Sequence, residues 1–468
     1  MRKLLLILIL PVSSMAGGFA LSGIGGKALS LGGSYVSLVS DWTAIYWNPA
    51  GLTGASKQIG IYTNVIGTFG DATTQTGIIG MDGPFSLKNY PINTQQSFLI
   101  PAFGFVLPYK ENVFAFGLYV PFGLGAKWDL YSLPIGYRDD GIDNYPKIDH
   151  ESSIEVLNIV GGYARKFSSL SVGISLGLSR TSILLRKVNF AILDGNKDGS
   201  PDLGYPYSLI PVDVKLTGTG FGFVANLGLK YELSKLSFAW ALRFNSSPTL
   251  KGNIEANAYL PKSDYYYKMS NNPIFLGGIS NSKASGSAQL KLPIITDFGI
   301  SYKFNEKLLS AVFFQYQNWS TFDEIILSID SANQTGDPLL GKFLPSEEEF
   351  VQGWKSTFKF GMGIEYRFKS NLPLRFGFAF DQSPIPDSTF NPLIPDPGNK
   401  IQLTAGFSRE YNNFSYDFNF EYFILPKKTI SNTDYNPLKS HNLPGEYRFL
   451  WKYKVFKIKV IREIIIFS

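Results

Sequence analysis

The sequence has no cysteine and only two histidines, His150 and His441, among its 468 residues. The absence of cysteine excludes disulfides, thiol nucleophiles and thiolate metal sites. Two histidines leave little room for a catalytic triad or a histidine-rich metal centre, and neither has a visible set of partner residues. We therefore expect a protein that is not an enzyme and that binds no cofactor.

Charge and long apolar segments are also scarce. Asp, Glu, Lys and Arg make up 17% of the chain, below the roughly 25% of an average soluble domain. The net charge of +6 is spread along the sequence, so a nucleic-acid partner is not expected. After the first residues, no run reaches the ~18–20 apolar residues that a membrane-spanning helix needs.

The N-terminus has the pattern of an export signal. Two basic residues precede an apolar run at 4–10, and a small-x-small cleavage site follows at Ser14–Ala16. This pattern predicts a signal peptide over residues 1–16 and a mature chain that begins near Gly17. A buried N-terminal strand or helix is the alternative.

What the chain has in excess is aromatic residues, at 15%, and strict alternation. In Leu170–Ser179 every second residue is apolar and the residues between are Ser or Gly, and residues 357–368 place all their charges on one face. Bulky aromatics occupy the same face of strand after strand, which suits a lipid surface better than a filled interior. The pattern favours a transmembrane β-barrel over a soluble β-sandwich.

The connections between the predicted strands alternate in length. Six short turns lie near residues 110–112, 166–169, 232–235, 305–307, 370–372 and 411–413. Seven longer stretches lie near 67–98, 122–152, 184–216, 248–288, 321–355, 383–399 and 424–449. This arrangement predicts an all-β fold of fourteen antiparallel strands over residues 55–468, with short periplasmic turns and seven long extracellular loops.

A barrel of that width needs a plug or remains open. Residues 17–54 precede the first predicted strand and are rich in small residues, with a helical piece that starts at Asp41 and stops at Pro49. We expect this segment to fill the lumen as a small helical plug.

Several motifs carry a family resemblance. Gly32–Tyr35 and Asp41–Leu52, which contains the triplet Asn48, Pro49 and Ala50, resemble the N-terminal hatch of the FadL/TodX family of outer-membrane hydrophobic-compound transporters. Gln317–Ser320, and Asp381–Pro386 with Ile394–Asp396, resemble its later strand and loop signatures. The resemblance covers Gly17 to Phe423 and rests on the order and spacing of these motifs.

The resemblance implies a monomeric barrel in the bacterial outer membrane, in contact with outer-membrane lipid. It would carry long-chain fatty acids or similar hydrophobic molecules inward, capture them among extracellular loops, pass them to a pocket beside the hatch and release them sideways through the third strand. Asp41, Asn48, Pro49 and Ala50 would be structural residues of the hatch.

For the sideways exit, proline matters because it cannot donate to a β-ladder. Pro121, Phe122, Gly123 and Gly125 follow the apolar alternation of the third predicted strand. We expect the proline and glycines to kink the barrel wall there and Phe122 to line the opening. The alternative is that Pro121 only ends the strand at its outer rim.

The capture groove should be apolar and reachable from outside. The loop residues predicted for it are Tyr205, Tyr207, Tyr259, Leu260, Tyr265, Tyr266, Tyr267, Ile274, Phe275 and Leu276. Packing of these loops on one another is the competing interpretation. A fatty carboxylate would need a cation, and Lys127, Arg138, Lys215 and Lys262 are candidates among which the sequence does not decide.

Two further segments stand apart. Asp194, Asn196, Asp198 and Asp202 have the spacing of a calcium loop, but position twelve is Tyr205 in place of the bidentate Glu, so an acidic surface turn is the stronger interpretation and no metal site is predicted. The last predicted strand, near 450–464, is atypical because it is rich in lysine and its alternation slips. Either a bulge restores the register or the terminus is altered.

The sequence therefore predicts passive uptake of long-chain fatty acids or similar compounds through a plugged outer-membrane barrel. An aromatic-hydrocarbon transporter of the same fold is the nearest alternative. A structural or adhesive barrel, and an outer-membrane lipid hydrolase, are alternatives of other classes.

Overall fold

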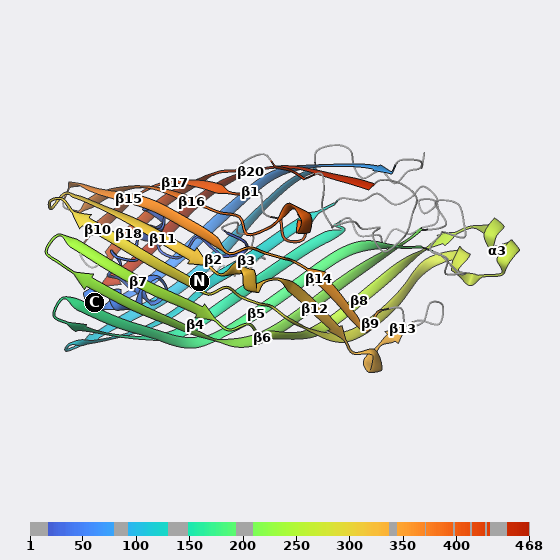
Figure 1. Ribbon diagram of the computed structural model, residues 1–468, viewed down its shortest axis with the longest axis horizontal. Helices are drawn as coiled ribbons and strands as arrows, with labels where there is room; N and C mark the ends of the chain where they lie inside the picture. The colour runs from blue at the N-terminus through green and yellow to red at the C-terminus, as the bar shows by residue number, and fades with distance from the viewer. Residues whose placement is uncertain are drawn as a thin grey trace, which may run out of the picture.

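The computed structural model describes residues 17–78, 92–129, 148–192, 209–336, 344–369, 371–395, 398–411, 414–425, 428–430 and 447–467. These residues form mainly antiparallel β-strands that wrap into an elongated tube (Figure 1). In the described part of the chain, no helix is long and apolar enough to cross a membrane.

The strands of the tube wall are long and tilted. They are β1 (Gln58–Ile78), β2 (Ile92–Tyr109), β3 (Asn112–Trp128), β4 (His150–Phe167), β5 (Leu170–Ile192), β6 (Leu209–Glu232), β7 (Leu236–Asn245), β10 (Ile295–Lys303), β11 (Leu308–Gln317), β15 (Thr357–Lys369), β16 (Leu372–Asp381), β17 (Lys400–Tyr411), β18 (Phe414–Ile424) and β20 (Tyr447–Phe467). Each pairs with the next in this order.

β20 pairs with β18 on one side and with β1 on the other. The β1–β20 ladder runs from Gln58 opposite Phe467 to Ile78 opposite Tyr447 without a register shift. The segment that looked atypical in sequence is therefore a regular strand of the sheet, and no bulge interrupts its ladder with β1.

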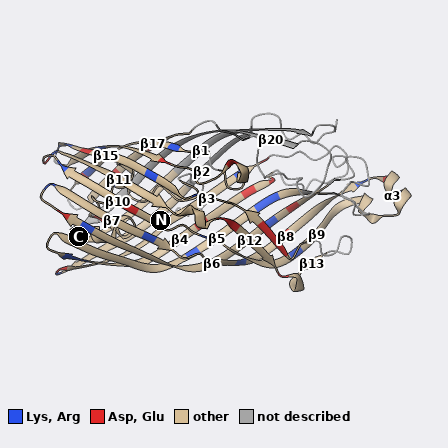
Figure 2. Ribbon diagram, viewed as in Figure 1, with Lys and Arg blue, Asp and Glu red and all other residues tan. Residues whose placement is uncertain are grey.

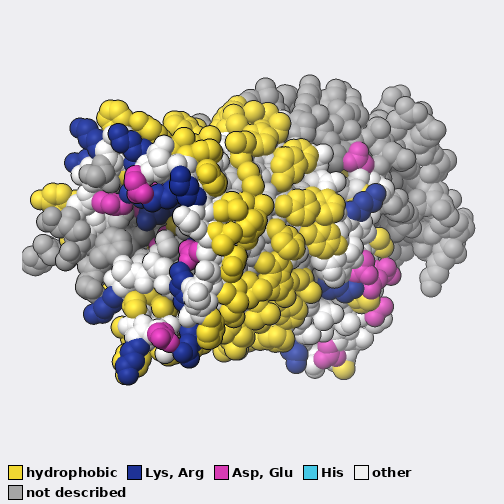
Figure 3. Space-filling view, turned by 60° about the vertical axis from the view of Figure 1, so that its left-hand side comes forward, with side chains coloured by type: hydrophobic (Ala, Val, Ile, Leu, Met, Phe, Trp, Pro, Cys, Tyr) yellow, Lys and Arg dark blue, Asp and Glu magenta, His cyan; other side chains and the backbone are white. Residues whose placement is uncertain are grey.

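The two surfaces of the wall differ as the alternation predicts. Leu178 and Phe221 are 67% and 74% exposed on the outside, whereas Ser175 and Ser179 on the intervening positions are buried. On the face shown in Figure 3, the outward residues form an apolar belt between charged ends. Such an apolar belt is the surface that lipid chains cover.

The two ends of the tube also differ. Short turns join the strands at one end, where Lys110 and Ser168 adopt left-handed φ angles of 55° and 56°. At the other end, several strands continue well beyond the belt (Figure 1). The predicted long connection at 184–216 is strand at both ends, because β5 runs to Ile192 and β6 begins at Leu209.

Two other predicted loops contain structure that the sequence analysis missed. Residues 248–288 form β8 (Thr249–Lys262), α3 (Asp264–Ser270), the 3-10 helix η3 (Pro273–Phe275) and β9 (Leu276–Gln289). Residues 321–355 contain β12 (Glu324–Ile329), η5 (Ser331–Asn333), β13 (Thr335–Gly336) and β14 (Glu347–Val351). η4 (Trp319–Thr321), η6 (Asp387–Thr389) and β19 (Lys428–Ile430) complete the elements. β8 pairs with β6 where β7 has ended, so this hairpin extends the sheet outward.

Residues 17–54, called here the N-terminal segment, lie inside the tube and fold into α1 (Gly26–Ser30), α2 (Ala44–Trp47) and η1 (Pro49–Gly54). Most of the segment is buried. The wall has glycines where the segment approaches it closely. A Cβ at Gly60 or Gly104 would overlap the Trp42 indole, and a Cβ at Gly173 would overlap the backbone of Pro49 and Ala50. The segment occupies the space that larger side chains at these wall positions would fill.

This packing predicts a position-specific effect of adding bulk to the wall. Gly173→Val would force Pro49 or the strand to move, so we expect roughly 1–3 kcal/mol of destabilisation and release of the N-terminal segment. Thermal unfolding and limited proteolysis of residues 17–54 measure both effects.

Gly161→Val is the matched control, because Gly161 lies on the neighbouring strand and an added Cβ there meets nothing within 4 Å. Equal sensitivity of the two variants would contradict the packing described here.

Candidate functional site

The triplet Asn48, Pro49 and Ala50 joins the N-terminal segment to the wall. The Asn48 side chain accepts a hydrogen bond from Ala50 N at 3.0 Å and donates to Val36 O at 3.2 Å and Leu229 O at 3.1 Å. Pro49 opens η1 at a position where its missing N–H is harmless. One side chain thus fixes a turn of the segment and anchors it to β6.

Asp41 was predicted to begin a helix, but α2 begins three residues later at Ala44. The Asp41 carboxylate instead accepts hydrogen bonds from the backbone and hydroxyl of Thr43 and, at 2.6 Å, from the Tyr35 hydroxyl. Burial, together with the adjacent carboxylate, raises the pKa of Tyr35 well above its ordinary value, so the phenol stays a donor. Asp41 is a structural residue of the segment.

The wall strands carry buried ion pairs on the side that faces the segment. Arg243 pairs with Asp297 and lies 4.5 Å from the ring centroid of Tyr46. Elsewhere, Arg375 pairs with Glu365 at 2.7 Å and with Asp417 at 3.3 Å. Charges that would be costly in lipid are thereby paired on the luminal side.

β3 has the irregularity that its sequence predicts. Its register with β4 shifts between Tyr119 and Phe122, which places a bulge next to Pro121. The strand nevertheless continues to Trp128. The alternative in which Pro121 only ends the strand is therefore wrong.

Next to this bulge, β2 separates from β3. The β2–β3 ladder ends at the pair Phe103 and Leu118, and beyond that point β2 pairs with β1 while β3 pairs with β4. Within the described strands, the outer part of β3 therefore has a neighbour on one side only. We call this place the β2–β3 gap.

The N-terminal segment fills the backbone positions that β2 leaves. Leu21 N donates to Pro121 O, and Gly123 N donates to Phe19 O, both at 2.9 Å. Ala20 and Phe122 form an antiparallel bridge between these bonds. Pro121, which has no N–H, thus contributes its carbonyl to a three-residue substitute for a β-ladder.

Aromatic side chains close the gap from inside. Phe19 contacts Phe122 at a ring-centroid distance of 6.0 Å, Trp319 at 4.8 Å and Trp354 at 5.7 Å. Phe322 completes the group, which we call the aromatic cluster. Phe122 is buried in this cluster, where it contacts Phe19 of the N-terminal segment.

The start of the N-terminal segment is held next to the same cluster. Gly17 N donates to Asp381 Oδ2 at 2.8 Å, and Trp319 Nε1 donates to Gln317 Oε1 at 2.8 Å. Sequence motifs that are far apart in the chain therefore meet at the β2–β3 gap.

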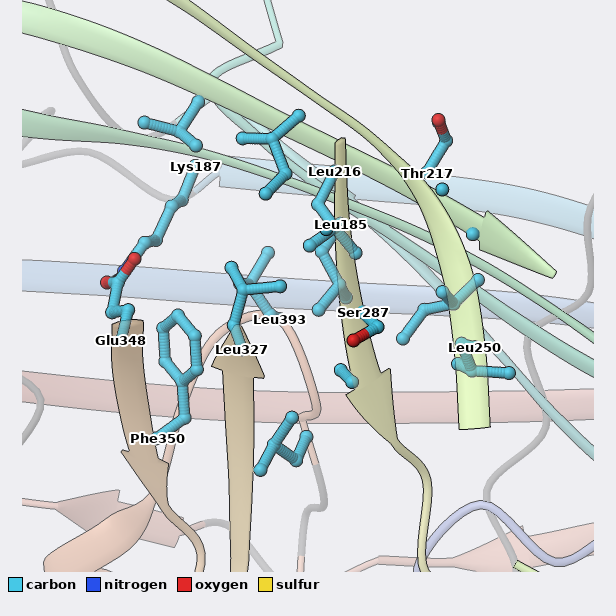
Figure 4. Close-up of a pocket in the computed structure, with 18 of the residues that line it drawn as sticks. Leu185, Lys187, Leu216, Thr217, Leu250, Ser287, Leu327, Glu348, Phe350 and Leu393 are labelled. Atoms are coloured by element: carbon cyan, nitrogen blue, oxygen red, sulfur yellow. The ribbon is translucent and has the colours of Figure 1, made fainter. Parts of the chain in front are cut away.

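An apolar pocket opens above the cluster, between β5, β6, β8, β9, β12 and β14. The pocket is partly open to solvent. Leu185, Leu216, Leu250, Leu327 and Leu393 are among the residues that line it (Figure 4). Lys187, Glu348 and Phe350 lie together at one end (Figure 4).

The pocket is continuous with the aromatic cluster. Ile183, Leu250 and Ile325 line the pocket, and they belong to the same buried apolar group as Phe19 and Phe122. An apolar molecule in the pocket is thus connected by apolar side chains to the β2–β3 gap.

The predicted capture residues lie elsewhere. Leu260, Ile274 and Phe275 form a separate buried group at the tip of the β8–β9 hairpin, against which Tyr266 and Tyr267 pack. Tyr265 and Leu276 are exposed and Tyr259 is buried. None of these lines the apolar pocket, and the competing interpretation of packing among the loops describes their geometry.

The predicted cations have mixed outcomes. Lys127 pairs with Glu151 at 2.7 Å, Lys262 ends β8, and Lys215 lies beside the pocket residues Val214 and Leu216 without lining the pocket. The sequence analysis missed Lys187, because only the pairing of β5 and the approach of β14 show which way it points.

Other predicted residues lie outside the described residues. They are the signal peptide 1–16, Tyr205, Tyr207, Arg138, His441 and the weak calcium candidates Asp194, Asn196, Asp198 and Asp202. His150 is described, and its Nδ1 lies 2.7 Å from Asp149 Oδ1 in a buried pair. Among the described ranges, no group of three or more His, Asp or Glu side chains could hold a metal ion.

Comparison with known families agrees with this architecture. The family model described as outer membrane protein transport protein (OMPP1/FadL/TodX) matches residues 7–452. The chain belongs to this family. Members are outer-membrane proteins of Gram-negative bacteria, which places the apolar belt in that membrane. The family consists of transport proteins, in keeping with the expectation that the chain is not an enzyme.

Individual relatives are distant. The long-chain fatty acid transport protein of Escherichia coli (strain K12) is 27% identical over 199 residues, which span 42% of this chain and 40% of the relative. A putative outer membrane protein of Neisseria meningitidis serogroup B is 25% identical over 404 residues, 81% of this chain and 80% of the relative. The chain thus spans about two fifths of the fatty acid transport protein that it matches.

Solved structures share the fold. A Pseudomonas aeruginosa FadL homologue superimposes with a TM-score of 0.72 at 16% identity, covering 96% of this chain and 99% of the other. The Pseudomonas putida toluene transporter TodX gives a TM-score of 0.66 at 15% identity, with the same coverage.

The anchoring role of Asn48 predicts how strongly different substitutions at this position destabilise the N-terminal segment. Asn48→Ala removes three hydrogen bonds, and we expect the free energy of unfolding to fall by about 1–3 kcal/mol for each buried group left unpaired. Asn48→Asp should be at least as harmful, because its carboxylate would face the carbonyl oxygens of Val36 and Leu229. Protease sensitivity of the N-terminal segment measures the effect.

Asn112→Ala serves as control, since Asn112 accepts a bond from Tyr163 in an exposed turn. A harmless Asn48→Asp would show that the two donor bonds do not anchor the segment.

Proposed function

We propose that the protein carries hydrophobic small molecules across the outer membrane, from the apolar pocket past the N-terminal segment and out through the β2–β3 gap. The observation that carries this proposal is the substitution of residues 19–21 for β2 along the outer part of β3. A wall ladder that is completed by three residues of an internal segment can open when that segment moves.

In this proposal the strand pairings close a monomeric barrel of fourteen strands, and the N-terminal segment is its hatch. Pairing of β20 with both β18 and β1 supports closure. Wall glycines that receive Trp42, Pro49 and Ala50 support the hatch.

The sideways route has a physical advantage over a water-filled pore. Each methylene of an acyl chain returned to water costs about 0.8 kcal/mol. A molecule that moves from the pocket along the aromatic cluster and then into the membrane keeps its chain among apolar groups throughout. The gap lies beside the apolar belt, so this route needs no aqueous step.

Phe19 is the proposed gate. It occupies an apolar site made by Phe122, Trp319, Phe322 and Trp354. An acyl chain or an aromatic ring fits the same surroundings, so a ligand can compete with Phe19 and free the residues that complete the β3 ladder.

Cleavage after Ala16 would strengthen the closed state. The Gly17 nitrogen would become an ammonium group next to Asp381, whose Oδ1 is buried and has no hydrogen-bond partner among the residues that the structure describes. An amide supplies one donor, whereas an ammonium supplies three and a charge. Removal of the signal peptide would therefore complete the anchoring of the hatch.

The proposed ligands are long-chain fatty acids, with aromatic hydrocarbons as the alternative. The printed names of the relatives include both a fatty acid transport protein and a toluene transporter. Binding of labelled oleate to the detergent-solubilised mature protein, with toluene as competitor, separates the two. Displacement by toluene would favour the hydrocarbon.

A reversible disulfide across the β2–β3 gap tests whether the gap must open for uptake. Ala20 and Phe122 are a non-hydrogen-bonded antiparallel pair, whose Cα atoms are typically about 4.5 Å apart, within the range that a disulfide spans. The variant Ala20→Cys with Phe122→Cys has no other cysteine to compete. We expect uptake of oleate to stop on oxidation and to return on reduction.

The single variants Ala20→Cys and Phe122→Cys are controls for loss of the side chains and should not respond to oxidant. Full uptake by the oxidised double variant, with the disulfide verified by mass spectrometry, would overturn the proposed exit.

A further inference from the structure

A cation, Lys187, lies at one end of the apolar pocket. A route for apolar molecules does not by itself require a charge there. Lys187 Nζ lies 3.0 Å from Glu348 Oε1 and 4.5 Å from the ring centroid of Phe350. Beyond this group, leucines and isoleucines line about half of the pocket, among small residues and the polar side chains of Thr217, Asn253, Ser287, Gln352 and Asn391. The geometry is that of a charged head site joined to an apolar tail site.

The two partners of this ion pair are held unequally. The Lys187 side chain is 17% exposed and rises from β5 in the middle of the extended sheet, whereas the Glu348 side chain is 33% exposed on the short strand β14. In the described chain, β14 pairs with β12 only. Glu348 can therefore turn into water at less cost than Lys187 can lose a counter-charge.

We propose that Lys187 is the residue by which the pocket recognises a carboxylate, and that Glu348 occupies the place of the ligand headgroup until a long-chain fatty acid anion displaces it. This inference rests on the proposed transport function and names its substrate class. The exchange conserves charge, since Lys187 is paired with one carboxylate both before and after binding.

The arrangement also orients the ligand. Lys187 lies farther along β5 from the short-turn end than Ile183, which joins the pocket to the aromatic cluster. A carboxylate at Lys187 points its chain toward Phe19. The tail, and not the head, therefore reaches the hatch first.

Other charges near Lys187 do not oppose this role. Glu347 and Glu349 are exposed and alternate with Glu348 along β14, so they point to the other face of the strand. Arg186 is paired with Asp213 on the opposite face of β5 at 2.8 Å. A fatty acid carboxylate thus meets one cation whose present partner is replaceable.

The test compares oleate with oleyl alcohol, which has a similar chain and no charge. Lys187→Gln should weaken oleate binding by roughly ten- to a hundredfold, the loss of one charge-assisted contact, and leave oleyl alcohol unchanged. Glu348→Gln should act in the opposite direction and tighten oleate binding, because it removes the competing carboxylate. Combining the two changes should give the affinity of Lys187→Gln alone.

Lys215→Gln is the matched control, because it removes a lysine from β6, beside the pocket but outside its lining. Tryptophan fluorescence titration of the detergent-solubilised mature protein gives the affinities, and heat-dependent gel mobility checks that each barrel is folded. A parallel loss for oleate and oleyl alcohol in Lys187→Gln, or weaker oleate binding in Glu348→Gln, would overturn the headgroup role. Failure of the folded wild-type protein to bind either probe would instead contradict the proposed transport function.

Discussion

In a bilayer, every backbone N–H and C=O must find a partner within the protein, and this constraint governs the β2–β3 gap. β2 turns away from β3 after the pair Phe103 and Leu118, which would leave the outer part of β3 without a ladder on that side. The N-terminal segment supplies the missing partners from inside the barrel. The wall and the N-terminal segment are therefore joined by backbone hydrogen bonds at this place.

The interior is built to hold the segment in one position. Wall glycines provide room for Trp42 and Pro49 at close range, Asn48 connects the segment to β6, and paired charges such as Arg243 with Asp297 are kept on the luminal side. Each device uses little space, which leaves the region above the aromatic cluster for the apolar pocket. The limited space inside the tube also explains why the sequence of the segment is rich in small residues.

Much of the wall could be predicted from the sequence, because lipid imposes a period of two on residues such as Leu170–Ser179. The extension beyond the belt was not predicted. β9 is made mostly of small and polar residues. The tyrosines at the hairpin tip resemble a binding loop, although Tyr266 and Tyr267 pack on a buried apolar group. The bulge at Pro121 was predictable from the chemistry of proline. Lys187 was not, since its partner Glu348 lies 161 residues away.

In the proposed mechanism Gly17 is the first residue of the mature chain, so the proposed gate is a chain end. A lid hinged at both ends must move a whole loop, whereas a terminus can detach residue by residue, like the fraying end of a strand. Two residues, Gly18 and Phe19, separate Gly17, whose nitrogen is anchored, from the Ala20–Phe122 bridge. Under this proposal the position of signal-peptide cleavage would set the length of the moving part, and a shift of that position by one residue would change how tightly the barrel is closed.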